Sequence, residues 1–413
     1  MILQVKLTLE IGFWACLVAV AYNYVGYPVL LFVLATLAQA KSDLSFLLRR
    51  GSRRRRASAV GLPRVALLVA AYNEEATIEA KVKNALEVDY PADLLEVLIG
   101  LDSPTDSTAA ILSRIQSARL RVHQFQARRG KLAVISDLTQ QTSAEILVFT
   151  DANTIFRADC VRNLVRHFAD PQVGAVSGEE IRLARRATET SGETLYWRYE
   201  SALKVLESRL DCCLGANGAV YAVRRSLFCP KGNSIVEDFQ VPVEIRFSGH
   251  RVVYDPEAIA FEELAPTFSS QFERRVRIAA GSLQLLFSNP QFLNPFRGLP
   301  ALSFFSHRML RWLGAYFLIV AFLTNAFLAR QPFYASLFVL QLIFYLAALV
   351  GYWRKKRGKP VRFLTAPLYF CSMNLAYVFG LLRYIRGRQQ LVWKVTPRQS
   401  APEVISVKSA ADL

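Results

Sequence analysis

Residues 65–75 read VALLVAAYNEE, seven consecutive apolar residues followed by a polar segment that ends in two glutamates. A short apolar run with a sharp polar boundary predicts a strand that is buried on both faces. The pattern then changes, and Glu75–Glu87 has the spacing of a helix. A buried strand followed by a helix is the first unit of an α/β sheet.

The same alternation of strand and helix continues as far as residue 150. Further strands are predicted at Glu96–Leu101, Leu120–Phe125 and Ile146–Thr150, and helices at Thr105–Ala118 and Lys131–Gln140. This order predicts an α/β fold with a parallel, Rossmann-like sheet covered by helices on both faces. Ligands of such sheets bind at the carboxyl ends of the strands, so the residues just after each strand are the candidates for a site.

Acidic residues occupy several of these positions. Glu74 follows the first strand, Asp102 the second, Asp151 the strand Ile146–Thr150, and Glu237-Asp238 comes much later. Their placement predicts one composite cleft. Helix capping is the alternative: Asp102 or Thr105 could cap the helix near Asp106, and Glu237-Asp238 could cap a helix at Phe239–Phe247.

Composition narrows the class of protein. The chain has 413 residues, 50 Lys and Arg against 33 Asp and Glu, a formal net charge of +17, 53% hydrophobic residues and a mean hydropathy of +0.23. So high an apolar fraction excludes a disordered chain. It also argues against a soluble nucleic-acid-binding protein, so no nucleic-acid partner is expected.

The positive charge is concentrated beside long apolar segments. Basic clusters lie within Lys41–Arg64, Arg354–Arg362 and Arg383–Arg398, and the first includes four consecutive arginines. This is the placement of charge that flanks cytoplasmic ends of membrane segments. A solvated linker or a nucleic-acid patch is the alternative for the arginine run.

We therefore predict a membrane-anchored chain in five parts. These are a transmembrane anchor (1–40), a basic juxtamembrane linker (41–62), a cytosolic catalytic domain (63–287), a membrane region with about three apolar segments (288–398) and a tail (399–413). The expected location is the inner (plasma) membrane, multi-pass, with the catalytic domain on the cytoplasmic side. Three spans after a cytosolic domain would place the C-terminus outside. The third basic cluster opposes this, because such clusters favour the cytoplasmic side. In an alternative topology, one of the three segments is re-entrant or interfacial.

Seven short motifs in a fixed order carry a family resemblance. They are Val69–Glu75, Leu101–Asp106, Arg129-Gly130-Lys131, Thr150–Asn153, Gly215–Ala219, Val236-Glu237-Asp238 and Gln271–Arg275. In this order, flanked by apolar segments, the chain resembles membrane-integrated family-2 glycosyltransferases, the group of cellulose, chitin, hyaluronan and poly-N-acetylglucosamine synthases. The resemblance implies a GT-A fold and a hexosyltransferase that moves sugar, with inversion, from a nucleoside diphosphate sugar.

The resemblance also implies roles for individual residues. The nucleotide sugar would be bound by Tyr72, Glu74, Asp102, Lys131, Asp151, Gln271 and Arg274. Asp151 and Asn153 would hold a divalent cation, Mg²⁺ or Mn²⁺, on the diphosphate, although Asn153 replaces the family's second Asp. Lys131 has an ordinary solvated lysine as its alternative.

The same resemblance assigns Asp238 as the general base, with Glu237 beside it. Gly215, Asn217 and Arg275 would border the acceptor, where the alternative for Gly215–Gly218 is an ordinary turn. Gln271, Arg274 and Arg275 are spaced to share one helix face. Arg275 replaces the family's Trp, which puts the acceptor type and processive synthesis in question.

The leading hypothesis is therefore synthesis of a polysaccharide from a UDP-sugar. One alternative is transfer of a single sugar to a polyprenyl-linked or lipid acceptor, and another is a membrane-anchored binding or regulatory subunit with weak activity. The expected partners are the UDP-sugar, a glycan or lipid-linked acceptor, the bilayer and an accessory export subunit. The sequence leaves the sugar, the linkage and the oligomeric state open.

Overall fold

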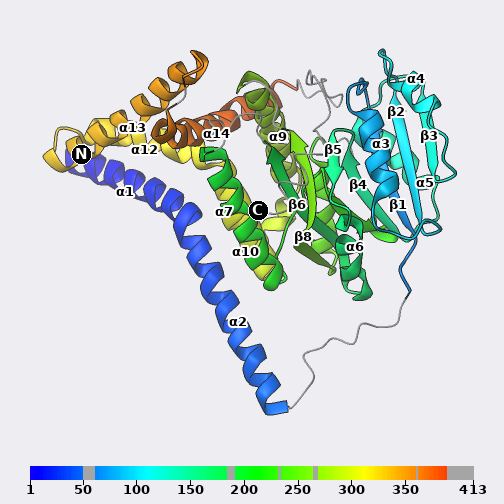
Figure 1. Ribbon diagram of the computed structural model, residues 1–413. Coiled ribbons are helices and arrows are strands. Elements are labelled where there is room, and N and C mark those ends of the chain that lie inside the picture. Colours follow the sequence, from blue (N-terminus) through cyan, green and yellow to red (C-terminus); the bar gives the residue numbers. More distant parts are fainter. Residues whose placement is uncertain (50–60, 184–190, 231–233, 264–267, 360, 388–413) are drawn as a thin grey trace. The chain divides into compact units, whose positions relative to one another are not determined.

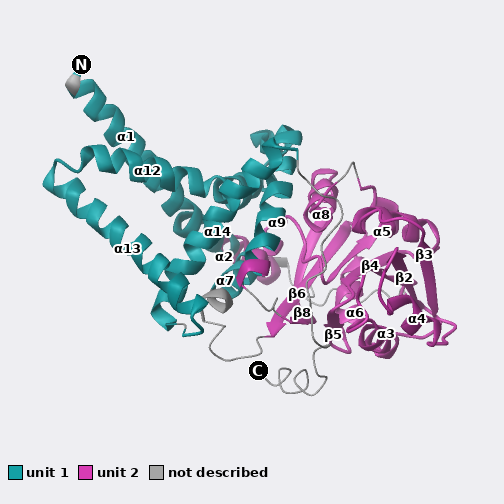
Figure 2. Cartoon of the chain, turned by 90° about the horizontal axis from the view of Figure 1, so that it is seen from above, with its two compact units in different colours: residues 1–36, 186–203, 271–389 teal, residues 37–185, 204–270, 390–413 magenta. Residues whose placement is uncertain are grey.

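The computed structural model describes residues 1–49, 61–183, 191–230, 234–263, 268–359 and 361–387. The chain forms two compact units (Figure 2). Unit 1 comprises residues 1–36, 186–203 and 271–389, and unit 2 comprises residues 37–185, 204–270 and 390–413. The arginine run at 53–56 lies outside the described residues, as does the part of the third basic cluster beyond residue 387.

Unit 2 contains an eight-stranded mixed sheet in the described part of the chain, with the order β3-β2-β1-β4-β7-β6-β8-β5. Strands β3, β2, β1 and β4 are labelled at one side of this sheet in Figure 1. The strands are β1 (Val65–Ala71), β2 (Leu95–Asp102), β3 (Leu120–Phe125), β4 (Ile146–Asp151), β5 (Thr154–Phe156), β6 (Val173–Leu183), β7 (Tyr221–Arg224) and β8 (Arg251–Glu263). The first four strands are parallel, whereas β7 runs antiparallel to both β4 and β6.

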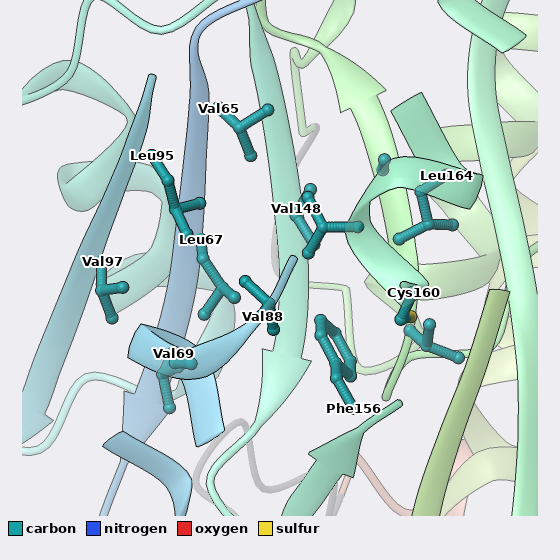
Figure 3. Close-up of a cluster of buried hydrophobic side chains, with 14 of the residues drawn as sticks. Val65, Leu67, Val69, Val88, Leu95, Val97, Val148, Phe156, Cys160 and Leu164 are labelled. Atoms are coloured by element: carbon teal, nitrogen blue, oxygen red, sulfur yellow. The ribbon is translucent and has the colours of Figure 1, made fainter. Parts of the chain in front are cut away.

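Helices cover both faces of this sheet. They are α3 (Ile78–Glu87), α4 (Thr108–Ser113), α5 (Lys131–Gln140), α6 (Cys160–Val165) and α8 (Glu237–Phe247), with 3₁₀ turns η2 (Arg166–Ala169) and η4 (Arg225–Leu227). Successive residues of a strand point to opposite faces, so β1 contributes to two hydrophobic cores. Figure 3 shows Val65, Leu67 and Val69 in the core that contains Val148 of β4 and Phe156 of β5.

The second core lies on the opposite face. Ala66, Leu68 and Ala70 of β1 join residues of α5 and α8 there. All seven residues of β1 are buried, as the apolar run predicted. Strands β1, β2 and β4 run parallel to one another, so their carboxyl ends lie at one edge of the sheet.

The structure confirms the α/β, GT-A type fold, with two differences in detail. The parallel arrangement holds for β1–β4 but the whole sheet is mixed. Helix α4 (Thr108–Ser113) is shorter at both ends than the predicted Thr105–Ala118. At its start, Asp106 lies in the preceding loop and accepts hydrogen bonds from the backbone N–H and the hydroxyl of Thr108.

Unit 1 is built mainly of helices. They are α1 (Ile2–Ala21), the π-helical η1 (Tyr22–Gly26), α2 (Tyr27–Arg49), α7 (Ser191–Arg209), α9 (Phe268–Ser288), η5 (Pro290–Leu293), η6 (Pro295–Arg297), α10 (Leu299–Ser303), the π-helical η7 (Phe304–Met309), α11 (Leu310–Trp312), α12 (Gly314–Leu328), α13 (Pro332–Lys356) and α14 (Arg362–Ile385). Helices α2, α7 and α9 begin or end in unit 2.

Three described helical segments are long and apolar enough to cross a membrane. They are Leu3–Leu48, Pro332–Lys356 and Arg362–Ile385. Leu299–Trp312 and Gly314–Leu328 together form a fourth candidate, bent by 56° at a break, as in a broken span or a re-entrant loop. The predicted segment at 312–329 therefore differs from the others, because its helix is interrupted at Leu313.

Candidate active site

The loops that follow β1 and β2 are tied to each other. The side chain of Asn73 donates to Thr105 Oγ1 at 2.9 Å and accepts from the Thr105 backbone N–H at 2.8 Å. The backbone N–H of Glu75 donates to Asp106 at 3.1 Å. Two of the sequence motifs thus form one layer at the carboxyl ends of neighbouring strands.

Asp102 positions the Arg-Gly-Lys motif. Its carboxylate is fully buried and accepts the backbone N–H groups of Arg129 at 2.7 Å and Gly130 at 3.0 Å. Gly130 has a φ of 91°, a conformation that glycine adopts without strain. The loop delivers Lys131 to the first position of α5. A nucleotide contact of Asp102 remains a prediction.

Lys131 links two acidic motifs that are 86 residues apart in the sequence (237 − 151). Its ammonium group lies 2.8 Å from Asp151 Oδ1 and 3.0 Å from Glu237 Oε1. Burial lowers the pKa of Lys131, but the attraction of Asp151 and Glu237 outweighs that effect, and the pKa is raised well above its ordinary value. Lys131 is therefore a charged side chain that two ion pairs fix in position, and not a freely solvated lysine.

The glycine-containing loop at 215–218 packs against the start of α8. The backbone N–H of Ala216 donates to the carbonyl oxygen of Asp238 at 2.8 Å. A Cβ atom on Gly218 would lie 2.6 Å from Asp238 Oδ2, so a side chain at this position would displace that carboxylate. Glu237 and Asp238 are the first two residues of α8, where acidic side chains also favour the helix N-terminus.

Asn217 holds the loop in place through both ends of its amide. Its Nδ2 donates to the carbonyl oxygen of Gly178 at 2.6 Å, and its Oδ1 accepts from Lys204. Its backbone N–H donates to Ser177 Oγ at 3.0 Å. These bonds give Asn217 a structural role, and acceptor binding by Gly215 and Asn217 stays a prediction.

Tyr72 and Glu74, the other residues predicted to bind the nucleotide, have ordered surroundings. The guanidinium of Arg128 stacks 3.4 Å from the centre of the Tyr72 ring. Glu74 Oε2 accepts from Thr77 Oγ1 at 2.8 Å, and its backbone N–H donates to Thr108 Oγ1 at 2.9 Å. Arg128 was not among the predicted site residues, although it directly precedes the Arg-Gly-Lys motif.

Lys81 is a second residue that was not predicted from the sequence. It lies on α3, is fully buried and donates to Thr150 Oγ1 at 2.8 Å and to the Thr154 carbonyl at 2.7 Å. Those two residues flank Asp151-Ala152-Asn153, so Lys81 supports the motif from both ends. Its ammonium also lies 4.4 Å from the centre of the Phe156 ring.

Asn153 is buried beside a carboxylate, because its Nδ2 donates to Glu262 Oε1 at 2.9 Å. Asp151 and Asn153 offer hard oxygen atoms suited to Mg²⁺ or Mn²⁺, with diphosphate and water as the remaining ligands. The described residues contain no group of three or more His, Cys, Asp or Glu side chains that could hold a metal by themselves.

Gln271, Arg274 and Arg275 lie on the part of α9 that belongs to unit 1. Arg275 stacks 4.4 Å from the centre of the Tyr369 ring and donates to Ser372 Oγ at 3.3 Å, both on α14. The replacement of the family's Trp therefore joins α9 to α14. The roles predicted for these three residues in donor and acceptor binding remain predictions.

The structure therefore combines a mixed sheet, acidic residues after its parallel strands, and a lysine that pairs with Asp151 after β4 and with Glu237 at the start of α8. The chain belongs to the family described as glycosyltransferase like family 2, which matches residues 63–281. All seven sequence motifs lie within the matched residues, whereas the first apolar segment and helices α12–α14 lie outside them.

Two named relatives are similar over about half of the chain. Poly-beta-1,6-N-acetyl-D-glucosamine synthase of Staphylococcus aureus (strain COL) is 27% identical over 232 residues, 54% of this chain and 55% of that protein. Beta-monoglucosyldiacylglycerol synthase of Synechocystis sp. is 28% identical over 243 residues, 55% of this chain and 50% of that protein. The chain spans about half the length of the curated relatives it matches.

A solved structure resembles the chain over most of its length. The mannosyltransferase PcManGT from Pyrobaculum calidifontis, in complex with GDP-Man and Mn²⁺, has a TM-score of 0.68 and 21% sequence identity. The similarity covers 91% of this chain and 99% of that one. This similarity supports the GT-A type fold. At 21% sequence identity it carries no information about the substrate.

Proposed function

We propose that the chain transfers a sugar, with inversion, from a nucleoside diphosphate sugar, most simply a UDP-sugar, to a growing polysaccharide. The observation that carries this proposal is the position of Lys131 between Asp151 and Glu237. A cation fixed beside the cleft motifs is suited to neutralise the negative charge that develops on a departing diphosphate.

In the proposed reaction, Asp238 takes the proton of the acceptor hydroxyl. The hydroxyl oxygen forms a bond to the anomeric carbon of the sugar while the bond from that carbon to the diphosphate breaks, and the nucleoside diphosphate leaves. General base catalysis requires a carboxylate within reach of the hydroxyl. Gly218 provides the space that the Asp238 carboxylate occupies.

Asp151 and Asn153 would hold a divalent cation in this reaction, which would supply further positive charge to the diphosphate. The Mn²⁺ in the complex of PcManGT supports the inclusion of a cation. Lys131 would also contact the diphosphate, and its bonds to Asp151 and Glu237 keep it in position.

Transfer of one sugar to a lipid-linked acceptor is the second candidate. It is favoured by Arg275, which stands where the family's Trp would offer a surface for a sugar ring and instead contacts α14. Similarity to a glycolipid synthase is consistent with this acceptor class. In both cases the three helical segments of sufficient length and apolarity would anchor the protein in the plasma membrane, with the catalytic unit on the cytoplasmic side.

The test is to incubate the purified full chain with a panel of UDP-sugars and Mn²⁺ and to measure UDP release and product size. A ladder of long products supports polysaccharide synthesis, and a single addition to an organic-extractable acceptor supports the second candidate. The Asp238→Asn variant should lose transfer and keep nucleotide binding. Full activity of that variant would remove Asp238 from the mechanism.

A further inference from the structure

Asn153 stands where the family has a second aspartate, but a carboxylate lies next to it, that of Glu262 on another strand. Glu262 lies on β8, is 2% exposed, and accepts the hydrogen bond from Asn153 Nδ2 at 2.9 Å. Strands β5 and β8 pair so that Thr154 is opposite Glu262, which fixes the end of the motif loop to β8. Asn153 and Glu262 are therefore neighbours at the place where β5 pairs with β8.

The chemistry of this pair fixes the orientation of the Asn153 amide. An ionised carboxylate only accepts hydrogen bonds, so the amide must turn its Nδ2 toward Glu262. Its Oδ1 is then on the opposite side of the amide and available as an acceptor for other groups. Because both side chains are buried, rotation of the amide would leave a buried carboxylate facing a carbonyl oxygen, which is costly.

The same geometry explains why position 153 is uncharged. An aspartate there would place a second carboxylate within about 3 Å of Glu262 in a site with little solvent, and two such groups do not both ionise. Asn153 adds no second negative charge beside Glu262.

We propose that Glu262 is a positioning residue for the nucleotide diphosphate and its cation, and that the neutral amide of Asn153 and the single carboxylate of Glu262 act together. Glu262 orients the Asn153 oxygen toward the donor and supplies the negative charge that an aspartate at 153 would otherwise carry. This inference rests on the proposed function, because it assumes that the donor's diphosphate binds beside Asp151.

The experiment is a double-mutant cycle on the full-length chain in detergent. UDP binding is measured by calorimetry with and without Mn²⁺, and thermal unfolding is followed in parallel, for Asn153→Asp, Glu262→Gln and the double variant. Glu257→Gln is the matched control, because Glu257 lies on the same strand with a side chain that is 63% exposed. UDP and Mn²⁺ are the probes.

Each single substitution should weaken Mn²⁺-dependent UDP binding by about tenfold, the lower end of what loss of an orienting partner costs at metal sites. UDP binding without Mn²⁺ should change little. The double variant should recover to within about threefold of the parent, because the amide introduced at position 262 can donate to the carboxylate introduced at position 153 and a single charge is restored. The control should bind like the parent.

Tighter Mn²⁺-dependent binding by Asn153→Asp alone, or additive effects in the double variant, would overturn the proposal. If Glu262→Gln does not fold, recovery of folded protein by the double variant supports the pair, and failure to recover counts against it. If the unaltered chain binds neither UDP nor GDP with Mn²⁺, the proposed function fails instead. The unfolding temperatures of the cycle then still decide whether the two residues are coupled.

Discussion

Gly218 determines how much space the proposed base has. A methyl group at this position would contact both Oδ2 and Cβ of Asp238, at 2.6 and 3.2 Å. We expect Gly218→Ala to move the Asp238 carboxylate and to lower kcat by at least about tenfold, because small displacements of a reacting group cost that much or more. Nucleotide binding should be nearly unchanged.

Steady-state kinetics and UDP calorimetry on the same preparation provide the measurement. Gly61→Ala is the matched control, since a Cβ atom there meets nothing within 4 Å. Equal kcat values for Gly218→Ala and the parent would mean that Asp238 is not confined by this loop.

Lys81 makes stability depend on pH in a specific direction. Burial lowers its pKa to about 7, against the opposing effects of Cys160 and Asp151. Between pH 7 and the ordinary pKa of 10.5, the unfolded chain holds a proton on Lys81 that the folded chain has released. Stability from this residue therefore rises with pH across that window.

Lys81→Met removes this ionisation, so the unfolding temperature of the parent relative to the variant should increase from pH 7 to about pH 9.5. The measurement is thermal unfolding of both proteins at several pH values. Lys83→Met on the same helix is the control, because Lys83 is exposed. A constant difference between parent and Lys81→Met would show that Lys81 does not titrate in this range.

Individual site residues differed in how far the sequence revealed them. Asp151, Glu237 and Lys131 were recognisable from motif order, and the structure brings these three together. Lys81 carried only a weak signal: it follows Ile78 by three residues and so shares the buried face of α3. Glu262 carried none, because its contact with Asn153 spans 109 residues of sequence.

At the scale of elements, helix α9 is attached to α14 through Arg275. Its guanidinium stacks on Tyr369 and donates to Ser372. Arg275→Leu should lower the free energy of unfolding by about 1 kcal/mol, the order expected for a partly buried cation–π contact. Chemical or thermal unfolding in detergent measures the change.

Glu273→Gln is the control for this substitution, because Glu273 lies on the same helix and is exposed. Combining Arg275→Leu with Tyr369→Leu should add less than the sum of the two single effects. Strict additivity would mean that the ring contact contributes nothing measurable to the attachment of α9.

Elements defined by local patterns were predictable, and those defined by distant pairing were not. Strand β1, strand β3 and helix α5 begin and end at the predicted residues, since an apolar period and its polar boundaries are local features. Neither β6 nor β8 was predicted from the sequence. Strand β8 contains Pro256 and pairs with β6 through a register shift, so its period of two is interrupted.

At the scale of the whole molecule, unit 1 is assembled from three segments that are far apart in sequence. Residues 191–203 of α7, which lie in the stretch predicted as the catalytic domain, group with the helical unit. Within that unit Glu200 of α7 pairs with Arg311 of α11 and lies 3.2 Å from His307 of η7. Asn23 of η1 donates to the Ser306 carbonyl at 2.6 Å, which adds the N-terminal segment.

This network links the three segments. It is buried, since Glu200, His307 and Arg311 are all less than 10% exposed. Removing one member of a buried ion pair leaves the other charge without compensation, which costs about 3–5 kcal/mol. We therefore expect Glu200→Leu to lower the unfolding temperature of the protein in lipid nanodiscs strongly. Glu200→Leu combined with Arg311→Met should recover most of the loss, since neither charge of the pair remains.

Glu273→Gln is the control for the network. Glu273 also lies in unit 1, but it is exposed and outside the candidate membrane spans, so its loss should cost less than about 1 kcal/mol. A double variant as unstable as Glu200→Leu would show that the network contributes through its hydrogen bonds rather than through charge pairing. An unaltered unfolding temperature in Glu200→Leu would show that the three segments are held together by apolar packing alone.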